Sequence, residues 1–143
     1  MLGIIFSIVA GAAMSLQGVL NTRLGEKIGL WETSALVQGI ALVVTLIAAF
    51  TIGDGNFRAL KDANKFYLLG GVLGAAITFT VMKGMGALGT TLAVAIILVS
   101  QLTAAAAIDH FGLFDATCVR CGVKQFIGVA VMILGIIIFK WKS

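Results

Sequence analysis

The sequence predicts an all-α integral membrane protein with five transmembrane helices. Hydrophobic residues make up 60% of the 143 residues and charged residues only 11%, whereas a soluble domain carries about 25% charged residues. The mean hydropathy is +1.12. The 18 glycines suit closely packed membrane helices. Because the chain contains no proline, glycine is the residue left to interrupt a helix.

Five apolar stretches are long enough to cross a hydrocarbon core, which takes about 20 helical residues. Hydrophilic breaks at 23–32, 53–65 and 109–122 and a short turn at 83–86 separate them. We therefore predict one five-helix transmembrane domain over residues 1–143, with spans at about 2–22, 33–52, 66–82, 87–108 and 123–139. The first span is read as retained, because it lacks the basic segment of a signal peptide.

The first four spans each carry a polar or small face opposite a lipid-facing one. At about 100° per residue, Gln17 and Asn21 share a face of the first span, Gln38 lies on such a face of the second, and Gln101 on that of the fourth. The fifth span is almost purely apolar and is predicted to be a packing helix. A polar group in hydrocarbon is costly unless it has a partner.

We predict that Gln17, Asn21, Gln38 and Gln101 line a substrate site near the membrane midplane, because amides both donate and accept hydrogen bonds. The alternative is interhelical hydrogen bonding at about 0.6 kcal/mol per bond. That alternative is favoured for the Thr and Ser residues. Further candidates for a pathway or gate are Ser100, Thr90, Lys83, Asp109 and His110. For Lys83, snorkelling to the interface is the favoured interpretation.

All six acidic residues lie in breaks or at span ends. A buried carboxylate is the usual proton-coupling group and cation counter-ion of small carriers. Its absence from the spans argues against an exchanger of protons for lipophilic cations of the small multidrug-resistance kind.

Other chemistries find little support in the sequence. Cys118 and Cys121 form one C-x-x-C, and zinc needs four ligands where only His110 is nearby, so neither a metal nor another cofactor is expected. Ser/His/Asp arrangements, paired carboxylates and phosphate-binding glycine loops are missing, which predicts a non-enzyme. The net charge of +4 comes from basic residues scattered singly at span ends, and this does not indicate nucleic-acid binding.

The basic residues are balanced across the membrane. Five alternating spans place five Lys or Arg on each side, namely Arg58, Lys61, Lys65, Arg120 and Lys124 against Arg23, Lys27, Lys83, Lys140 and Lys142. Because an excess of Lys and Arg sets the orientation, this balance predicts insertion in both orientations. Two oppositely oriented copies would form an antiparallel homodimer with 5+5 inverted repeats. The alternative is one orientation fixed by one or two dominant charges.

Three motifs resemble a known family. They are the ten residues from Leu16 to Gly25 (LQGVLNTRLG), the turn from Gly86 to Thr91 (GALGTT), and Val99–Leu102 (VSQL) followed by Ile108–Phe114 (IDHFGLF). Together they resemble the YdcZ-type small inner-membrane exporters of the drug/metabolite transporter superfamily, over essentially the whole chain. This sequence departs from the pattern at Ser100, where glycine is expected, and in its Cys118/Cys121 pair.

The resemblance implies a multi-pass protein of the bacterial inner membrane with five helices. It also implies that short members work as dual-topology homodimers or as paired, oppositely oriented subunits. We therefore predict a small secondary transporter that exports a small polar or amphipathic solute by alternating access. Its partners would be the lipid bilayer, a second inverted copy and a small-molecule substrate. The alternatives are a dual-topology ion channel and one subunit of a heteromeric transporter pair.

Overall fold

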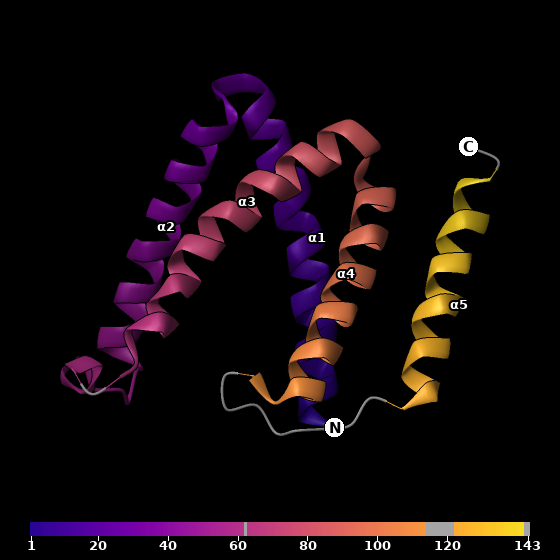
Figure 1. The fold of residues 1–143 in the computed structure, drawn as a ribbon. Coiled ribbons are helices and arrows are strands. Elements are labelled where there is room, and N and C mark those ends of the chain that lie inside the picture. The colour runs from indigo at the N-terminus through magenta and orange to yellow at the C-terminus, as the bar shows by residue number, and fades with distance from the viewer. Residues whose placement is uncertain (62, 114–121, 142–143) are drawn as a thin grey trace. The chain divides into compact units, whose positions relative to one another are not determined.

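The computed structural model describes residues 1–61, 63–113 and 122–141, and the chain divides into two compact units, Met1–Ala87 and Leu88–Ser143. Throughout the described residues the structure is helical and contains no strand (Figure 1). This confirms the predicted all-α class. The prediction of one five-helix domain stays a prediction, and the two units are described separately.

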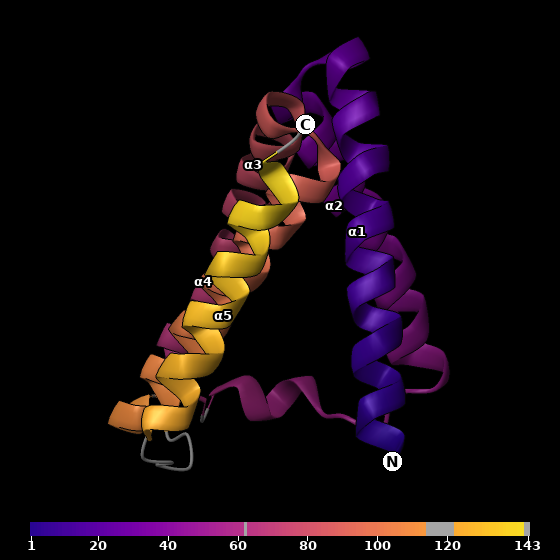
Figure 2. The same cartoon turned by 90° about the vertical axis from the view of Figure 1, so that its right-hand side faces the viewer.

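The first unit is a helical hairpin followed by a third helix. Helices α1 (Leu2–Ile28) and α2 (Leu30–Thr51) form the hairpin, whose closed end lies at Gly29 (Figures 1 and 2). Two 3₁₀ turns, η1 (Phe57–Lys61) and η2 (Lys65–Leu68), lead into α3 (Leu69–Leu88). The Asn64 side chain accepts a hydrogen bond of 3.1 Å from the Phe66 N–H and so caps η2.

The second unit is an antiparallel pair, α4 (Thr90–Phe111) packed against α5 (Val123–Lys140). Gly112 ends α4 in the left-handed conformation with φ 58°, and its N–H bonds the Ile108 carbonyl. A glycine at this position satisfies a helix-end carbonyl without a Cβ penalty. At the start of α5, the Gln125 side chain accepts a hydrogen bond of 2.8 Å from the Gly122 N–H.

Four helical segments of the described chain are long and apolar enough to cross a membrane: Leu2–Ile28, Leu30–Thr51, Lys65–Leu88 and Thr90–Phe111. The apolar part of α5, Gln125–Lys140, is shorter. Five helices are present as the sequence predicted, so the membrane-helical architecture is confirmed. A transmembrane role for α5 stays a prediction.

The helices extend further than the predicted spans. The break predicted at 23–32 contains the interruption at Gly29, but α1 continues to Ile28. The turn predicted at 83–86 is wrong, because these residues are helical and α3 continues to Leu88. The actual interruptions are single glycines, Gly29 with φ 100° and Gly89 with φ 79°. The 27 residues of α1 extend about 40 Å, longer than a hydrocarbon core of about 30 Å, so its charged last turns need no loop to reach water.

Each interrupting glycine also begins the next helix. The Gly29 N–H bonds the Gly25 carbonyl at 3.0 Å, and the Gly29 carbonyl accepts from the Thr33 N–H at 3.1 Å. The Gly89 carbonyl accepts from the Ala93 N–H at 3.1 Å in the same way. A positive φ combined with an extended ψ is a backbone conformation essentially restricted to glycine. At Gly29 the chain therefore reverses within one residue while both its N–H and its carbonyl stay hydrogen-bonded.

The polarity of the interior is the reverse of that in a soluble protein. The buried residues include four polar ones (Asn21, Thr22, Thr33 and Ser34), and the buried hydrophobic ones are Met82, Met85 and Ala93. Large hydrophobic side chains instead cover the outer surface of every helix. In lipid, small and polar residues mediate helix contacts while apolar ones face the acyl chains, which is the arrangement found here.

Candidate functional site

Polar burial in the first unit concentrates beneath the closed end of the hairpin. We call this cluster the hairpin junction, and its members are Gly18, Asn21, Thr22, Gly25, Thr33, Ser34, Met82 and Met85. Helix α1 contributes positions spaced by three or four residues, which lie on one helix face. Helix α2 contributes its first turn, and α3 contributes two methionines three residues apart.

The glycines of α1 allow the α3 methionines to approach closely. A Cβ placed on Gly18 would lie 2.5 Å from Met85 Cε and 2.8 Å from its Sδ. A Cβ on Gly25 would lie 2.8 Å from Leu30 Cδ2 and 3.5 Å from Met82 Sδ. A side chain at either position would have to displace the end of Met85 or Leu30. The flexible thioethers therefore fill the two notches that the glycines leave.

Thr33 and Thr22 differ in how their hydroxyls are satisfied. Thr22 Oγ1 donates to the Gly18 carbonyl at 2.7 Å, the usual bond of a helical threonine to the fourth residue before it. Thr33 has 0% of its surface exposed, and its Oγ1 has no hydrogen-bond partner. An unsatisfied buried hydroxyl destabilises the folded state by about 1–3 kcal/mol. Such a group marks a place where a second conformation would gain a hydrogen bond.

Helices α2 and α3 meet through an aromatic pair and an amide. Trp31 and Phe79 stack with ring centroids 4.4 Å apart and planes inclined by 19°. The Gln38 Nε2 lies 3.5 Å from where a Cβ on Gly74 would be. Gly74 therefore provides the room that the Gln38 amide occupies. Gln38 is half-buried at this contact.

The structure places the predicted substrate-site amides at different depths. Asn21 lies eight residues before Gly29 and Gln38 nine residues after it, so both are about 12–14 Å from the hairpin end. Asn21 is buried, whereas Gln17, one turn deeper on α1, is exposed. Gln101 is exposed and lies near the middle of α4, in the second unit. The structure thus brings Asn21 and Gln38 to one level of the hairpin and leaves their alignment with Gln101 a prediction.

The predicted gate residues are all exposed. The sequence predicts Lys83 in a turn between two helices. Lys83 instead lies within the last two turns of α3. Thr90 is the first residue of α4, and Ser100 lies at its middle. Asp109 and His110 are in the last turn of α4, where the His110 ring makes an edge contact with Phe111 at a centroid distance of 5.1 Å.

The closed end of the hairpin is charged on its surface. Arg23 and Glu26 form an ion pair of 3.2 Å between exposed side chains, and such pairs contribute little. The Glu32 carboxylate folds back over Gly29, so that a Cβ there would collide with it. Charged groups thus cover the surface above the buried junction.

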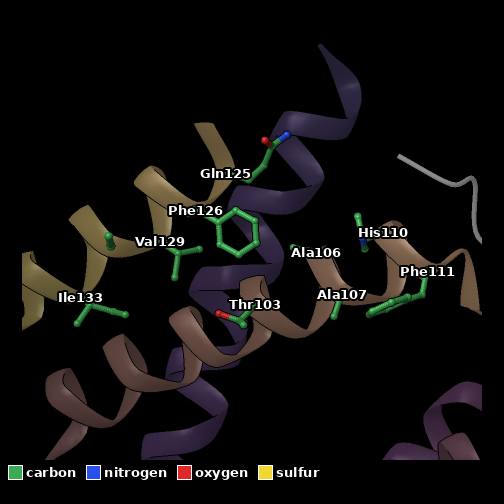
Figure 3. A pocket seen from close by; sticks show the side chains of 10 residues that line it. Thr103, Ala106, Ala107, His110, Phe111, Gln125, Phe126, Val129 and Ile133 are labelled. Atoms are coloured by element: carbon green, nitrogen blue, oxygen red, sulfur yellow. The ribbon is translucent and has the colours of Figure 1, made fainter. Parts of the chain in front are cut away.

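A cavity lies between α4 and α5, and the sequence did not predict it. We call it the α4–α5 groove; its volume is about 520 Å³ and its lining is almost wholly apolar (Figure 3). Its lining residues are Thr103, Ala106, Ala107, His110, Phe111, Gln125, Phe126, Val129, Ala130 and Ile133. The small side chains of Ala106, Ala107 and Ala130 leave space here.

Metal ligation has no support within the described part of the chain, where no three His, Cys, Asp or Glu residues gather. Cys118 and Cys121 lie outside the described residues.

The chain matches a family model over residues 2–138, nearly its whole length, and the family is described as "Putative inner membrane exporter, YdcZ". The chain belongs to this family. It is therefore a multi-pass protein of the inner membrane from an exporter family, which confirms the resemblance and the localisation predicted from the sequence. No curated protein and no solved structure matches the chain.

Proposed function

We propose that the protein is a small secondary transporter that exports a polar or amphipathic solute by alternating access as an antiparallel homodimer. The observation that supports this most strongly is the hairpin junction. Polar side chains are buried inside a membrane-spanning unit, directly beneath a hinge formed by one glycine. The buried Thr33 hydroxyl, which lacks a hydrogen-bond partner here, could gain one in a second conformation.

The depth of the junction supports a gating role. The junction lies within about two to three turns of Gly29, toward one end of α1 and α2. In an inverted second copy the same junction would lie toward the opposite face of the membrane. The dimer would then carry one junction near each face, with Gln17 one turn deeper on α1 than Asn21. Opening one junction while the other stays packed is the geometry that alternating access requires.

The charge distribution supports the inverted dimer. Arg23 and Lys27 lie on the last turns of α1, and Lys83 lies on the last turns of α3. Together with the C-terminal lysines they balance the five basic residues expected on the other side. Neither orientation is favoured by the rule that places Lys and Arg on the cytoplasmic side.

The topology test uses two single-cysteine variants, Gly55→Cys and Ser143→Cys, in a chain whose Cys118 and Cys121 are replaced by Ser. A membrane-impermeant maleimide is applied to intact spheroplasts and then to opened ones. If both orientations exist, about half of each cysteine reacts from outside at either position. Complete labelling of one position from outside and of the other only after opening would contradict the homodimer.

The pathway test needs no identified substrate, because thiols react as thiolates and therefore only where water reaches them. Cysteines are placed singly at positions 17, 38 and 101 in the same Cys-free background and treated with a small cationic methanethiosulfonate. The proposal expects reaction at all three. A cysteine at Val131, an exposed position of the apolar α5, is the matched control and should stay unreacted. Equal protection of all four positions would exclude a hydrated pathway.

A further inference from the structure

The α4–α5 groove has a polar end and an apolar body. Gln125 and His110 line it near the start of α5 and the end of α4, while Val129 and Ile133 line it farther along α5 (Figure 3). Asp109 is the neighbour of His110, so this end of α4 lies at the membrane–water interface. The groove therefore runs from the interface toward the bilayer core.

The length of the groove matches one leaflet. It covers Thr103–Phe111 on α4 and Gln125–Ile133 on α5, each about 12 Å long at 1.5 Å per residue. Half of a hydrocarbon core of about 30 Å is about 15 Å. The groove thus has room for an extended chain that reaches most of the way from the interface to the midplane.

The volume indicates what fills the groove. A volume of about 520 Å³ spread over about 12 Å gives a mean cross-section of about 45 Å², whereas a helix 10 Å in diameter needs about 80 Å². The whole cross-section of a helix therefore does not fit inside the groove. Water is unsuitable because an apolar cavity offers it no hydrogen-bond partners. Slender apolar chains remain, and the bilayer supplies them in large excess.

The Gln125 amide determines which ligand group can form a hydrogen bond at the interface end of the groove. Its Oε1 is committed to the Gly122 N–H at 2.8 Å, so the group that the amide has left to offer is its NH₂, a donor. A donor at this position is complementary to an acceptor oxygen, as found in the phosphate and ester groups of a phospholipid. An anionic oxygen would receive the stronger hydrogen bond.

We propose that the α4–α5 groove is a specific binding site for one bilayer phospholipid, whose acyl chain fills the apolar body and whose headgroup oxygen accepts from Gln125. This site is separate from the hairpin junction and does not depend on transport. The bound lipid completes the packing of α4 against α5, where the alanines leave the space unfilled.

The first measurement is the phospholipid retained by the full-length protein. Protein purified from membranes in mild detergent is analysed by native mass spectrometry. The wild type should keep one phospholipid per chain after extensive detergent washing. Ala106→Leu, which fills the groove, should lose it. Ala12→Leu is the matched control, because it adds the same atoms to an exposed alanine of α1 and should leave retention unchanged.

The headgroup contact is tested with Gln125→Glu. Glutamate keeps the oxygen that caps Gly122 but replaces the NH₂ donor with a second acceptor, which repels a phosphate. Phospholipid retention should weaken about tenfold, the effect of losing a hydrogen bond to a charged group. Unchanged retention in this variant and in Ala106→Leu would overturn the proposal.

A second readout works even if a variant fails to fold. Phe126, in the groove lining, is replaced by Trp in a chain carrying Trp31→Phe and Trp141→Phe, and the protein is reconstituted in phosphatidylglycerol vesicles brominated in the acyl chains. The introduced indole should be quenched, and the quenching should persist after dilution with unbrominated lipid, since a bound lipid exchanges slowly.

Relief of quenching by a single-chain fatty acid would assign the groove to a soluble amphiphile instead. Loss of dimer crosslinking in Ala106→Leu would assign it to a second copy, and either result contradicts the proposal.

Discussion

The hairpin junction and the α4–α5 groove differ in how completely side chains fill the space between neighbouring helices. At the junction, glycines of α1 receive the methionines of α3, and a Cβ on Gly18 would collide with Met85. In the groove, alanines stand where larger side chains could meet, and a cavity of about 520 Å³ remains. The junction buries polar groups, whereas the groove is lined by apolar ones with polar groups at its interface end.

The difference shows that small residues serve two purposes in one membrane protein. Glycine lets neighbouring groups approach until no space is left, which strengthens the van der Waals contacts that hold membrane helices together. Alanine holds the backbones at a distance set by its methyl group, and here the distance leaves room for another molecule. A small residue in the sequence therefore does not by itself say whether a contact is filled by protein.

The largest expected effect comes from adding volume at the two sites. Gly18→Leu should destabilise the first unit by about 3 kcal/mol, because an overpacked contact forces the helices apart. Ala106→Leu, which adds a comparable group in the groove, should change stability by less than about 1 kcal/mol. Thermal unfolding in detergent measures both.

The control for Gly18→Leu is Gly11→Leu, since no atom lies within 4 Å of a Cβ at Gly11. Adding Met85→Ala should restore much of the stability that Gly18→Leu loses, because the side chains at positions 18 and 85 compete for one space. Equal losses at Gly11 and Gly18 would show that the close contact with Met85 is not the cause.

The two hinge glycines provide the next comparison. Gly29→Ala should destabilise the protein by about 1–3 kcal/mol because of its positive φ, since the exposed Glu32 carboxylate can move aside. Gly89→Ala carries the same conformational strain with nothing within 4 Å of its Cβ, so the two variants should lose similar stability. Chemical denaturation measures both.

Gly39→Ala is the reference for the hinge variants, since it lies inside α2 with open space around it. Alanine is the better helix former by about 1 kcal/mol, so this variant should be neutral or slightly stabilised. A loss of stability in Gly39→Ala as large as that in Gly29→Ala would show that the positive φ of Gly29 is not the cause.

The paired and unpaired hydroxyls should respond with opposite signs. Thr33→Val keeps the shape of the side chain and removes the unsatisfied hydroxyl, and it should stabilise the protein by about 1 kcal/mol. Thr22→Val removes a bonded hydroxyl and should destabilise it by about 0.6 kcal/mol. The midpoint of thermal unfolding reports both changes, and a loss in Thr33→Val would mean that its hydroxyl is bonded in the folded protein.

The smallest effect is expected at the charged surface of the hairpin. Glu26→Gln breaks the ion pair with Arg23, whose side chain is 75% exposed against 53% for Glu26. Such a surface pair contributes less than about 0.5 kcal/mol. The midpoint of thermal unfolding should therefore barely change in Glu26→Gln. The difference from the wild type should not depend on the salt concentration. A shift as large as that of Thr33→Val would show that the surface charges help to close the junction.

The sequence by itself determined the class of the protein. Apolar runs of spanning length and scarce charge predicted a helical membrane protein, because lipid admits only backbone that is hydrogen-bonded within itself. The motifs around Gln17, Asn21 and Gln101 identified the family, which the match over residues 2–138 confirmed. The absence of proline also pointed to glycine as the helix breaker, as found at Gly29 and Gly89.

Tertiary structure decided where the helices end and which polar groups are buried. The sequence predicts breaks at 23–32 and 83–86, but α1 continues to Ile28 and α3 to Leu88, because a helix that extends past the hydrocarbon carries charge without unwinding. Periodicity placed Gln17 and Asn21 on one face, and only the tertiary structure decided that Asn21 is buried while Gln17 is not. The unpaired Thr33 hydroxyl and the α4–α5 groove depend on distances between helices, which a pattern along one chain does not encode.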